Sequence, residues 1–176
     1  MLTIHNYYLT EDIYNGKLRK RAETYIIKDN KLLVTIGTKS GNPSLPGGGI
    51  EGNENPKTAA ERETLEEVGI KVNFIKSLKP YSFNYVKEIG PWETLPYEIT
   101  RWKELGMETY PFIAEFVKED KSLFNSEGDG KSYKWMSSKE AIDAFRNLEK
   151  KDKYFRLRCP HIINIIKQLK NEKFIK

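Results

Sequence analysis

The stretch from Gly48 to Ile70 reads GGIEGNENPKTAAERETLEEVGI, and it decides how the rest of the chain is interpreted. It holds acids and one arginine at fixed spacing between two glycine-containing turns. Carboxylates are the ligands that hard divalent cations prefer, and arginine suits phosphate groups. The stretch therefore predicts a site for metal ions and phosphate, formed by Glu54, Arg62, Glu63, Glu66 and Glu67.

The middle of this stretch carries the signals of one helix. Asn55 is a good N-cap, and Pro56 suits the first helical position. Residues Lys57–Val68 are good helix formers, and Gly69 is a natural C-terminal stop. We therefore predict a helix that begins after Asn55 and ends before Gly69.

Three carboxylates of this helix share one face, because residues three and four positions apart lie one above the other. Arg62 precedes Glu66 by four residues, so we expect the two side chains to pair. Leu65 and Val68 are expected to point away from the acids, toward the core. The acidic face consists of Glu63, Glu66 and Glu67.

This acidic face is unfavourable without a counter-ion. Like charges at these spacings repel one another, and the helix macrodipole disfavours carboxylates in the last turns. A divalent cation reverses both penalties, and oxygen-only ligands favour Mg²⁺, with Mn²⁺ as a substitute. The alternative is a solvated acidic helix face, which leaves the fixed spacing of the glycines and the arginine without a reason.

The same residues resemble the signature of the Nudix hydrolases. That signature is Gly, five residues, Glu, seven residues, Arg-Glu, an aliphatic residue, any residue, Glu-Glu, any residue, Gly and an aliphatic residue. Thr64 is the one departure, because an aliphatic residue is usual there; Thr is close in shape to Val, so we expect a small packing effect. The preceding Leu45–Gly49 also resembles the family's usual lead-in. The matching positions are Gly48, Glu54, Arg62, Glu63, Glu66, Glu67, Gly69 and Ile70.

The resemblance implies an α/β fold of the α+β type, a mixed β-sheet sandwiched between α-helices, in a single domain over residues 1–176. It also implies that Mg²⁺-activated water cleaves a pyrophosphate bond in a small molecule linked to a nucleoside di- or triphosphate. Metal-assisted hydrolysis of this kind needs no covalent nucleophile.

The family's functional residues can be carried over position by position. Arg62 would orient Glu66, and Glu54 would brace the loop and the helix. The catalytic set would include Arg62, Glu66 and Glu67. The metal ligands would be Glu63, Glu66, Glu67 and the backbone carbonyl of Gly47.

In the Nudix fold, a loop after the later strands often supplies one more acid, as a base or a metal ligand. Glu127 is the candidate for a catalytic acid here, in the polar segment Asn125–Gly130. Asp129 and Glu115 are the alternatives. A solvent-exposed loop acid without a role is also an open interpretation.

Composition narrows the setting of this activity. A chain of 176 residues is long enough for one domain with a real core. The sequence has no apolar run of about 18 residues, so no membrane span is expected. The first residues lack the features of a signal peptide. Because Cys159 is the one cysteine, no intramolecular disulfide can form, and a cytoplasmic location is expected. Cys159 is expected to be buried, and His5 and His161 to be structural or surface residues.

The net charge of +5 suits an anionic substrate. The basic clusters are expected to be solvated surface, with a nucleic-acid track as the alternative. They comprise Lys17, Arg19, Lys20, Arg21, Lys150, Lys151 and Lys153, with Arg156 and Arg158 nearby.

Outside the motif the chain alternates strand-like and polar segments. Asp29-Asn30 predicts a turn, and Ser137 with Glu140 predicts a capping box for a helix to about Leu148. Pro160 is expected to open a last amphipathic helix. The predicted strands are Ala22–Lys28, Leu32–Ile36, Lys71–Ser77, Tyr81–Ile89, Thr109–Lys118 and Tyr133–Met136.

The substrate is less well defined by the sequence. ADP-ribose hydrolases of the family often carry a proline about fifteen residues after the motif, whereas Pro80 follows Ile70 by ten. Dinucleoside polyphosphate hydrolases often carry a tyrosine slightly farther on, and Tyr85 comes close to that position. Aromatic residues could stack on a nucleobase or serve only in packing: Phe83, Trp92, Tyr97 and Trp102.

Three functions are therefore open. The first is a Mg²⁺-dependent pyrophosphohydrolase that acts on a small nucleotide. The second is an RNA 5′-end pyrophosphohydrolase of the decapping type, and the third is a catalytically silent nucleotide-binding module. A homodimer is an open alternative, and no membrane partner is expected.

Overall fold

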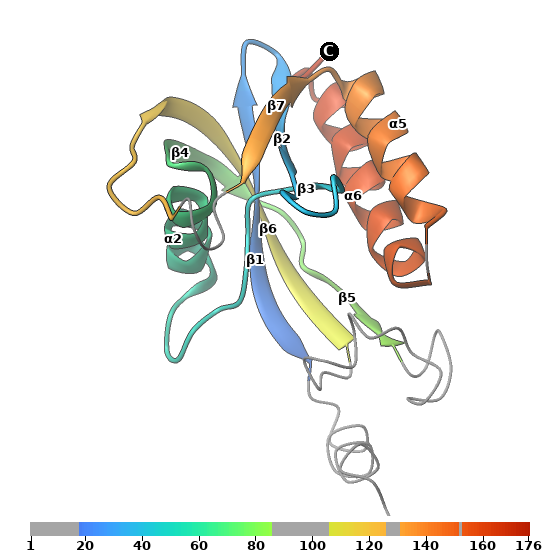
Figure 1. Ribbon diagram of the computed structural model, residues 1–176, viewed down its shortest axis with the longest axis horizontal. Coiled ribbons are helices and arrows are strands. Elements are labelled where there is room, and N and C mark those ends of the chain that lie inside the picture. Colours follow the sequence, from blue (N-terminus) through green and yellow to red (C-terminus); the bar gives the residue numbers. More distant parts are fainter. Residues whose placement is uncertain (1–17, 86–105, 126–130, 152) are drawn as a thin grey trace, which may run out of the picture.

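The computed structural model describes residues 18–85, 106–125, 131–151 and 153–176 (Figure 1). In these residues a mixed sheet lies between helices, with α2 on one face and α5 and α6 on the other. This is the α+β sandwich that the resemblance implied. The elements are β1 (Arg19–Lys28), β2 (Lys31–Ile36), β3 (Pro43–Ser44), α2 (Pro56–Val68), β4 (Ile70–Ser77), β5 (Tyr81–Asn84), β6 (Gly106–Glu119), β7 (Ser132–Met136), α5 (Ser138–Glu149) and α6 (Lys153–Asn171).

The centre of the sheet is a parallel pair, β1 and β6, in register from Arg19 opposite Met107 to Ile27 opposite Glu115. The strand order is β3-β2-β1-β6-β4, and the other pairings are antiparallel; β5 also pairs with β6, and β7 with β2. Because helices cover both faces, the central strand β1 is buried along most of its length.

The predicted turn between the first two strands is confirmed. Asp29 and Asn30 have φ values of 51° and 59°, and Lys28 pairs with Lys31 on either side of them. Two residues with positive φ form the hairpin turn whose twist matches that of the strands, and Asp and Asn tolerate that conformation well.

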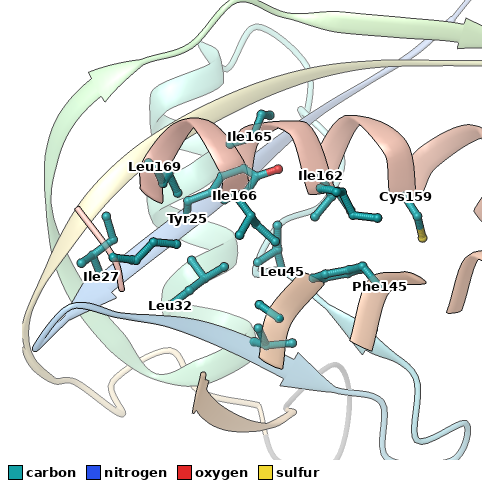
Figure 2. Close-up of a cluster of buried hydrophobic side chains, with 14 of the residues drawn as sticks. Tyr25, Ile27, Leu32, Leu45, Phe145, Cys159, Ile162, Ile165, Ile166 and Leu169 are labelled. Carbon is teal, nitrogen blue, oxygen red and sulfur yellow. The ribbon is translucent and has the colours of Figure 1, made fainter. Parts of the chain in front are cut away.

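The larger core cluster lies between the sheet and the pair α5 and α6 (Figure 2). Tyr25 comes from β1 and Leu32 from β2, and both are fully buried. Phe145 comes from α5, and Ile162 and Ile166 come from α6. On the opposite face of the sheet, a second cluster joins α2 to the strands through Val68, Ile26, Leu33, Ile70, Val72 and Ala114.

Both predicted helix starts around α2 and α5 are confirmed. The side chain of Asn55 accepts a hydrogen bond from the backbone N–H of Thr58 (3.0 Å), and Gly69 ends α2 with φ 62°. Ser137 and Glu140 form the predicted capping box, in which the Ser137 N–H donates to the Glu140 carboxylate (2.8 Å). Local signals thus determine these helix ends.

The prediction that Pro160 opens the last helix is wrong. Helix α6 begins at Lys153 and contains Pro160 in its interior. A proline in a helix interior lacks one backbone donor and costs roughly 3 kcal/mol. Arg158, Cys159 and Ile162 surround this position and are buried, so their packing outweighs that cost. Burial of Cys159 was expected.

Several expected features fall outside the described residues, among them Glu127, Asp129, Trp92, Tyr97, Trp102 and His5. Phe83 is described and lies in a small buried cluster with Tyr85 and Met107, which favours packing over base stacking. Among the helices that the structure describes, none is both long and apolar enough to cross a membrane.

Candidate active site

The motif acids gather around one arginine. Arg62 makes two hydrogen bonds to the carboxylate of Glu54, from Nε (3.1 Å) and Nη2 (3.0 Å). Its Nη1 donates to Glu63 (3.0 Å) and to Glu66 (3.1 Å), so the predicted pair with Glu66 is present. Nη2 also donates to the backbone carbonyl of Gly49 (2.9 Å). A single side chain therefore fixes three carboxylates and the glycine loop relative to one another.

These contacts shift the titration of two acids in opposite directions. The hydrogen bonds from Arg62 are the main reason that the pKa of Glu54 lies below its ordinary value. Burial raises the pKa of Glu63, and the nearby charges of Glu67 and Glu66 raise it further, although Arg62 opposes them. The surroundings of Glu63 therefore destabilise the ionised form of its carboxyl group.

Glu67 is the most buried of the motif acids, with 5% of its surface exposed. Its Oε2 accepts a hydrogen bond from the backbone N–H of Gly47 (3.1 Å). Its Oε1 accepts a hydrogen bond from Nζ of Lys131, a residue that the sequence did not single out. Glu67 is therefore held from the loop on one side and from the start of β7 on the other.

The glycine loop lies against β1 and against the acids. Ala22 donates its backbone N–H to Gly48 (3.0 Å), and Thr24 donates to Pro46 (2.8 Å), so the loop is bonded to the strand edge. A Cβ on Gly48 would lie 2.2 Å from Oε1 of Glu63. A side chain at position 48 would therefore have to displace the Glu63 carboxylate from its hydrogen bond with Arg62.

Thr64, the one departure from the signature, takes a core position. It is fully buried, and its hydroxyl donates to the carbonyl of Ala60 (2.7 Å) and lies 3.2 Å from the hydroxyl of Thr24. Leu65 is half-buried, so it is less enclosed than a core position implies, whereas Val68 is fully buried as expected. The Thr64 hydroxyl is accommodated in the core because it bonds to the Ala60 carbonyl and faces the Thr24 hydroxyl on β1.

A group of buried charges includes Arg21 and Arg158, two of the basic residues that were expected at the surface. Arg158 on α6 donates to Glu23 on β1 (2.7 Å), and Arg21 donates to the Gly47 carbonyl (3.1 Å). Tyr25 also donates its hydroxyl to Glu23 (3.0 Å). Burial raises the pKa of Glu23, but the charges of Arg158 and Arg21 together lower it below its ordinary value. The expectation of solvated basic residues is thus wrong for Arg21 and Arg158, which are about nine-tenths buried.

The additional acids have different positions. Glu115, an alternative to Glu127, is exposed on β6 and lines a hollow with Lys173 and Phe174 whose lining includes none of the motif acids. Glu127 itself lies outside the described residues. The described residues on either side of its segment, Asn125 and Lys131, donate backbone hydrogen bonds to the carbonyls of Glu66 (3.2 Å) and Glu67 (2.8 Å).

Within the residues that the structure describes, no three His, Cys, Asp or Glu side chains already converge as a set of metal ligands. Arg62 and Lys131 are hydrogen-bonded to the carboxylates that would bind a cation. All the atoms that would bind the metal are oxygens. The Gly47 carbonyl oxygen accepts a hydrogen bond from Arg21 and keeps a second lone pair for a metal ion. This chemistry suits a hard divalent cation once these basic groups yield their carboxylate oxygens.

A sequence model of the NUDIX domain matches residues 18–158. The chain belongs to the Nudix family. No curated protein matches the sequence.

Solved structures share the Nudix fold with this chain. A NUDIX hydrolase from Nitrosomonas europaea has a TM-score of 0.58 and 17% identity, over 82% of this chain and 87% of the other. A UDP-X diphosphatase has a TM-score of 0.51 and 15% identity, over 74% and 60% of the two chains. A MutT NUDIX hydrolase from Burkholderia pseudomallei has a TM-score of 0.50 and 19% identity, over 70% and 85%. At these identities the likeness shows the fold alone.

Proposed function

We propose that this Nudix protein hydrolyses a pyrophosphate bond in a small nucleoside di- or triphosphate derivative, with Mg²⁺ as the cofactor and Mn²⁺ as a substitute. The observation that supports this most strongly is the carboxylate face of α2, which Arg62 holds against the glycine loop. Arg62 is a single positive charge that faces Glu54, Glu63 and Glu66 together, so it leaves the negative charge of this face incompletely neutralised.

The chain's own residues would divide the work as follows. Glu63, Glu66 and Glu67 would bind the cation, which when bound lowers the pKa of a water molecule and neutralises charge on the phosphate. Arg62 keeps Glu63 and Glu66 oriented, and Glu54 fixes Arg62 through two hydrogen bonds. Groups that orient metal ligands in this way commonly change metal affinity or activity 10–100-fold, roughly, when they are altered.

Glu127 is the proposed additional acid. The hydrogen bonds of Asn125 and Lys131 to the last turn of α2 support this assignment, because they fix both described flanks of its segment beside Glu66 and Glu67. An acid between these two flanking residues is in a position along the chain to supply one more carboxylate to the metal-binding face. Glu127→Gln is the variant that would test this role.

A substrate panel tests the proposed reaction. It measures phosphate and nucleotide release, with Mg²⁺ or with EDTA, from nucleoside triphosphates (oxidised ones included), ADP-ribose, dinucleoside polyphosphates and 5′-triphosphorylated RNA. A UDP-linked compound belongs in the panel because one structural relative is a UDP-X diphosphatase. Cleavage of a small compound supports the proposal, and cleavage of RNA alone favours the decapping alternative. Silence throughout, with or without EDTA, favours a binding module.

Glu67→Gln separates an enzyme from a binding module. The substitution keeps the size of the side chain and removes the charge that a cation needs, so we expect kcat to fall more than about 100-fold, beyond the range of groups that only support a ligand. Glu61→Gln, an exposed acid on the same helix, is the matched control and should keep full activity. Wild-type turnover by Glu67→Gln would contradict the metal assignment.

A further inference from the structure

Lys131 is attached to Glu67 at two points. Its Nζ donates to the Glu67 carboxylate, and its backbone N–H donates to the Glu67 carbonyl (2.8 Å). The side chain of Lys131 is about one-quarter exposed, whereas that of Glu67 is almost completely buried. The lysine therefore covers the one proposed metal ligand that is most shielded from water.

The motif acids divide between two cations. In the described residues Arg62 forms ion pairs with Glu51, Glu54, Glu63 and Glu66, and Lys131 is the ion-pair partner of Glu67. A buried carboxylate without a partner is costly, so this ammonium stabilises Glu67 where it stands. A divalent cation bound to the same oxygen would repel the ammonium at close range.

The two Lys131 contacts have different consequences. If Glu67 binds a cation, Nζ of Lys131 would have to leave the carboxylate, whereas the backbone hydrogen bond to the helix end would be unaffected. The released ammonium then stays within one side-chain length of the metal-binding face. A polyphosphate bound at that face would offer the ammonium an anion in place of Glu67, and lysine binds phosphate as a flexible point charge.

We propose that Lys131 is a phosphate-binding residue that is stored on Glu67, competes there with the divalent metal, and moves to a phosphate oxygen of the substrate when the metal binds. This inference rests on the proposed function, because it assumes that Glu67 is a metal ligand. It adds a residue outside the motif that links metal binding to substrate binding.

The test uses Mn²⁺ alone, with free Mn²⁺ measured by electron paramagnetic resonance on the full chain. Lys131→Met removes the competing charge, so it should bind Mn²⁺ about threefold or more tightly than the wild type, whereas Lys131→Arg should stay close to the wild type. A damaged site binds metal more weakly, so the direction of the change separates competition from structural loss. Unchanged or weaker binding by Lys131→Met overturns the proposal.

Lys121→Met is the charge-matched control. Lys121 lies at the same end of α2, where its Nζ donates to the Val68 carbonyl (3.3 Å). Its substitution removes one positive charge nearby without changing the contact at Glu67, so Mn²⁺ affinity should change less than in Lys131→Met. An equal gain in both variants would show a general charge effect and overturn the proposal.

The phosphate step is tested with imidodiphosphate, a pyrophosphate analogue that resists hydrolysis, at saturating Mn²⁺. Lys131→Met should bind it several-fold more weakly than the wild type, although it binds the metal more tightly. Unchanged binding of imidodiphosphate overturns the phosphate step.

Glu63→Gln distinguishes failure of this inference from failure of the proposed function. If the wild type binds Mn²⁺ no better than Glu63→Gln, the metal site itself is wrong. If the wild type binds better and Lys131→Met matches the wild type, only the role of Lys131 is wrong.

Discussion

At the scale of single residues, Arg62 stands out because all three of its guanidinium nitrogens donate hydrogen bonds. Its planar guanidinium donates to Glu54, Glu63, Glu66 and the Gly49 carbonyl at the same time. A lysine carries the same charge but has no fork with which to form paired bonds. The position therefore depends on shape as well as on charge.

We expect Arg62→Lys to fold and to lose activity. The Glu54 carboxylate loses its paired hydrogen bonds and the glycine loop loses its anchor, so kcat/KM should fall roughly 10–100-fold, the range for groups that orient metal ligands. Steady-state kinetics on the substrate found in the panel measures the change. Arg146→Lys, at an exposed position on α5, is the control. Full activity of Arg62→Lys would show that charge alone suffices.

At the scale of helices and strands, the sequence predicts the helix ends and turns that depend only on residues close together in the chain. The ends of α2 and α5 follow from their caps, and the β1–β2 turn follows from Asp29 and Asn30. The start of α6 was mispredicted at Pro160. The turns of α6 before the proline are stabilised by tertiary packing of Arg158 and Cys159, which the local preferences of proline do not predict. The spacing rule that places Glu63, Glu66 and Glu67 on one face belongs to the predictable part.

The contact between α2 and β1 gives a second prediction. Thr64→Val removes one of two hydroxyls that face each other in the core, so the Thr24 hydroxyl loses its partner, at a cost of about 1–3 kcal/mol. The double variant Thr24→Val and Thr64→Val removes both hydroxyls and should recover most of that loss. Urea unfolding of the four proteins in this cycle measures the coupling. A double variant that loses the sum of the single losses would contradict it.

At the scale of the whole molecule, long-range pairs are what the sequence could not predict. Arg158 and Glu23 lie on different elements and are far apart in the chain, yet they form a buried ion pair across the sheet–helix interface. Lys131 reaches Glu67 in the same way, over many intervening residues. Composition predicts only that such charges exist, so a surface position was the default interpretation of Arg158.

This buried pair makes stability depend on acid. The pKa of Glu23 is lowered in the folded protein from its ordinary 4.5, so the pair stabilises the fold above that pH, and the contribution is lost as pH falls through the lower folded-state value. Glu23→Gln leaves Arg158 buried without its partner and should cost roughly 3–5 kcal/mol at neutral pH. Thermal unfolding between pH 7 and pH 3 should show a smaller acid-induced loss in the variant than in the wild type.

Glu172→Gln is the control for that experiment, because Glu172 pairs with Lys76 at an exposed position. Exposed pairs contribute little, so this variant should melt close to the wild type at neutral pH. A similar loss in both variants would mean that burial of Glu23 does not matter.

The parallel pairing of β1 with β6 has a consequence for how the molecule is made. The glycine loop and α2 both rest on β1, and β1 has its central partner in the second half of the chain. During synthesis the complete motif is translated before β6, and non-local pairings of this kind form late. A nascent chain thus contains every acid of the motif before it contains the strand that pairs with β1. A chain that ends before β6 would contain the signature residues, but β1 would lack its central partner.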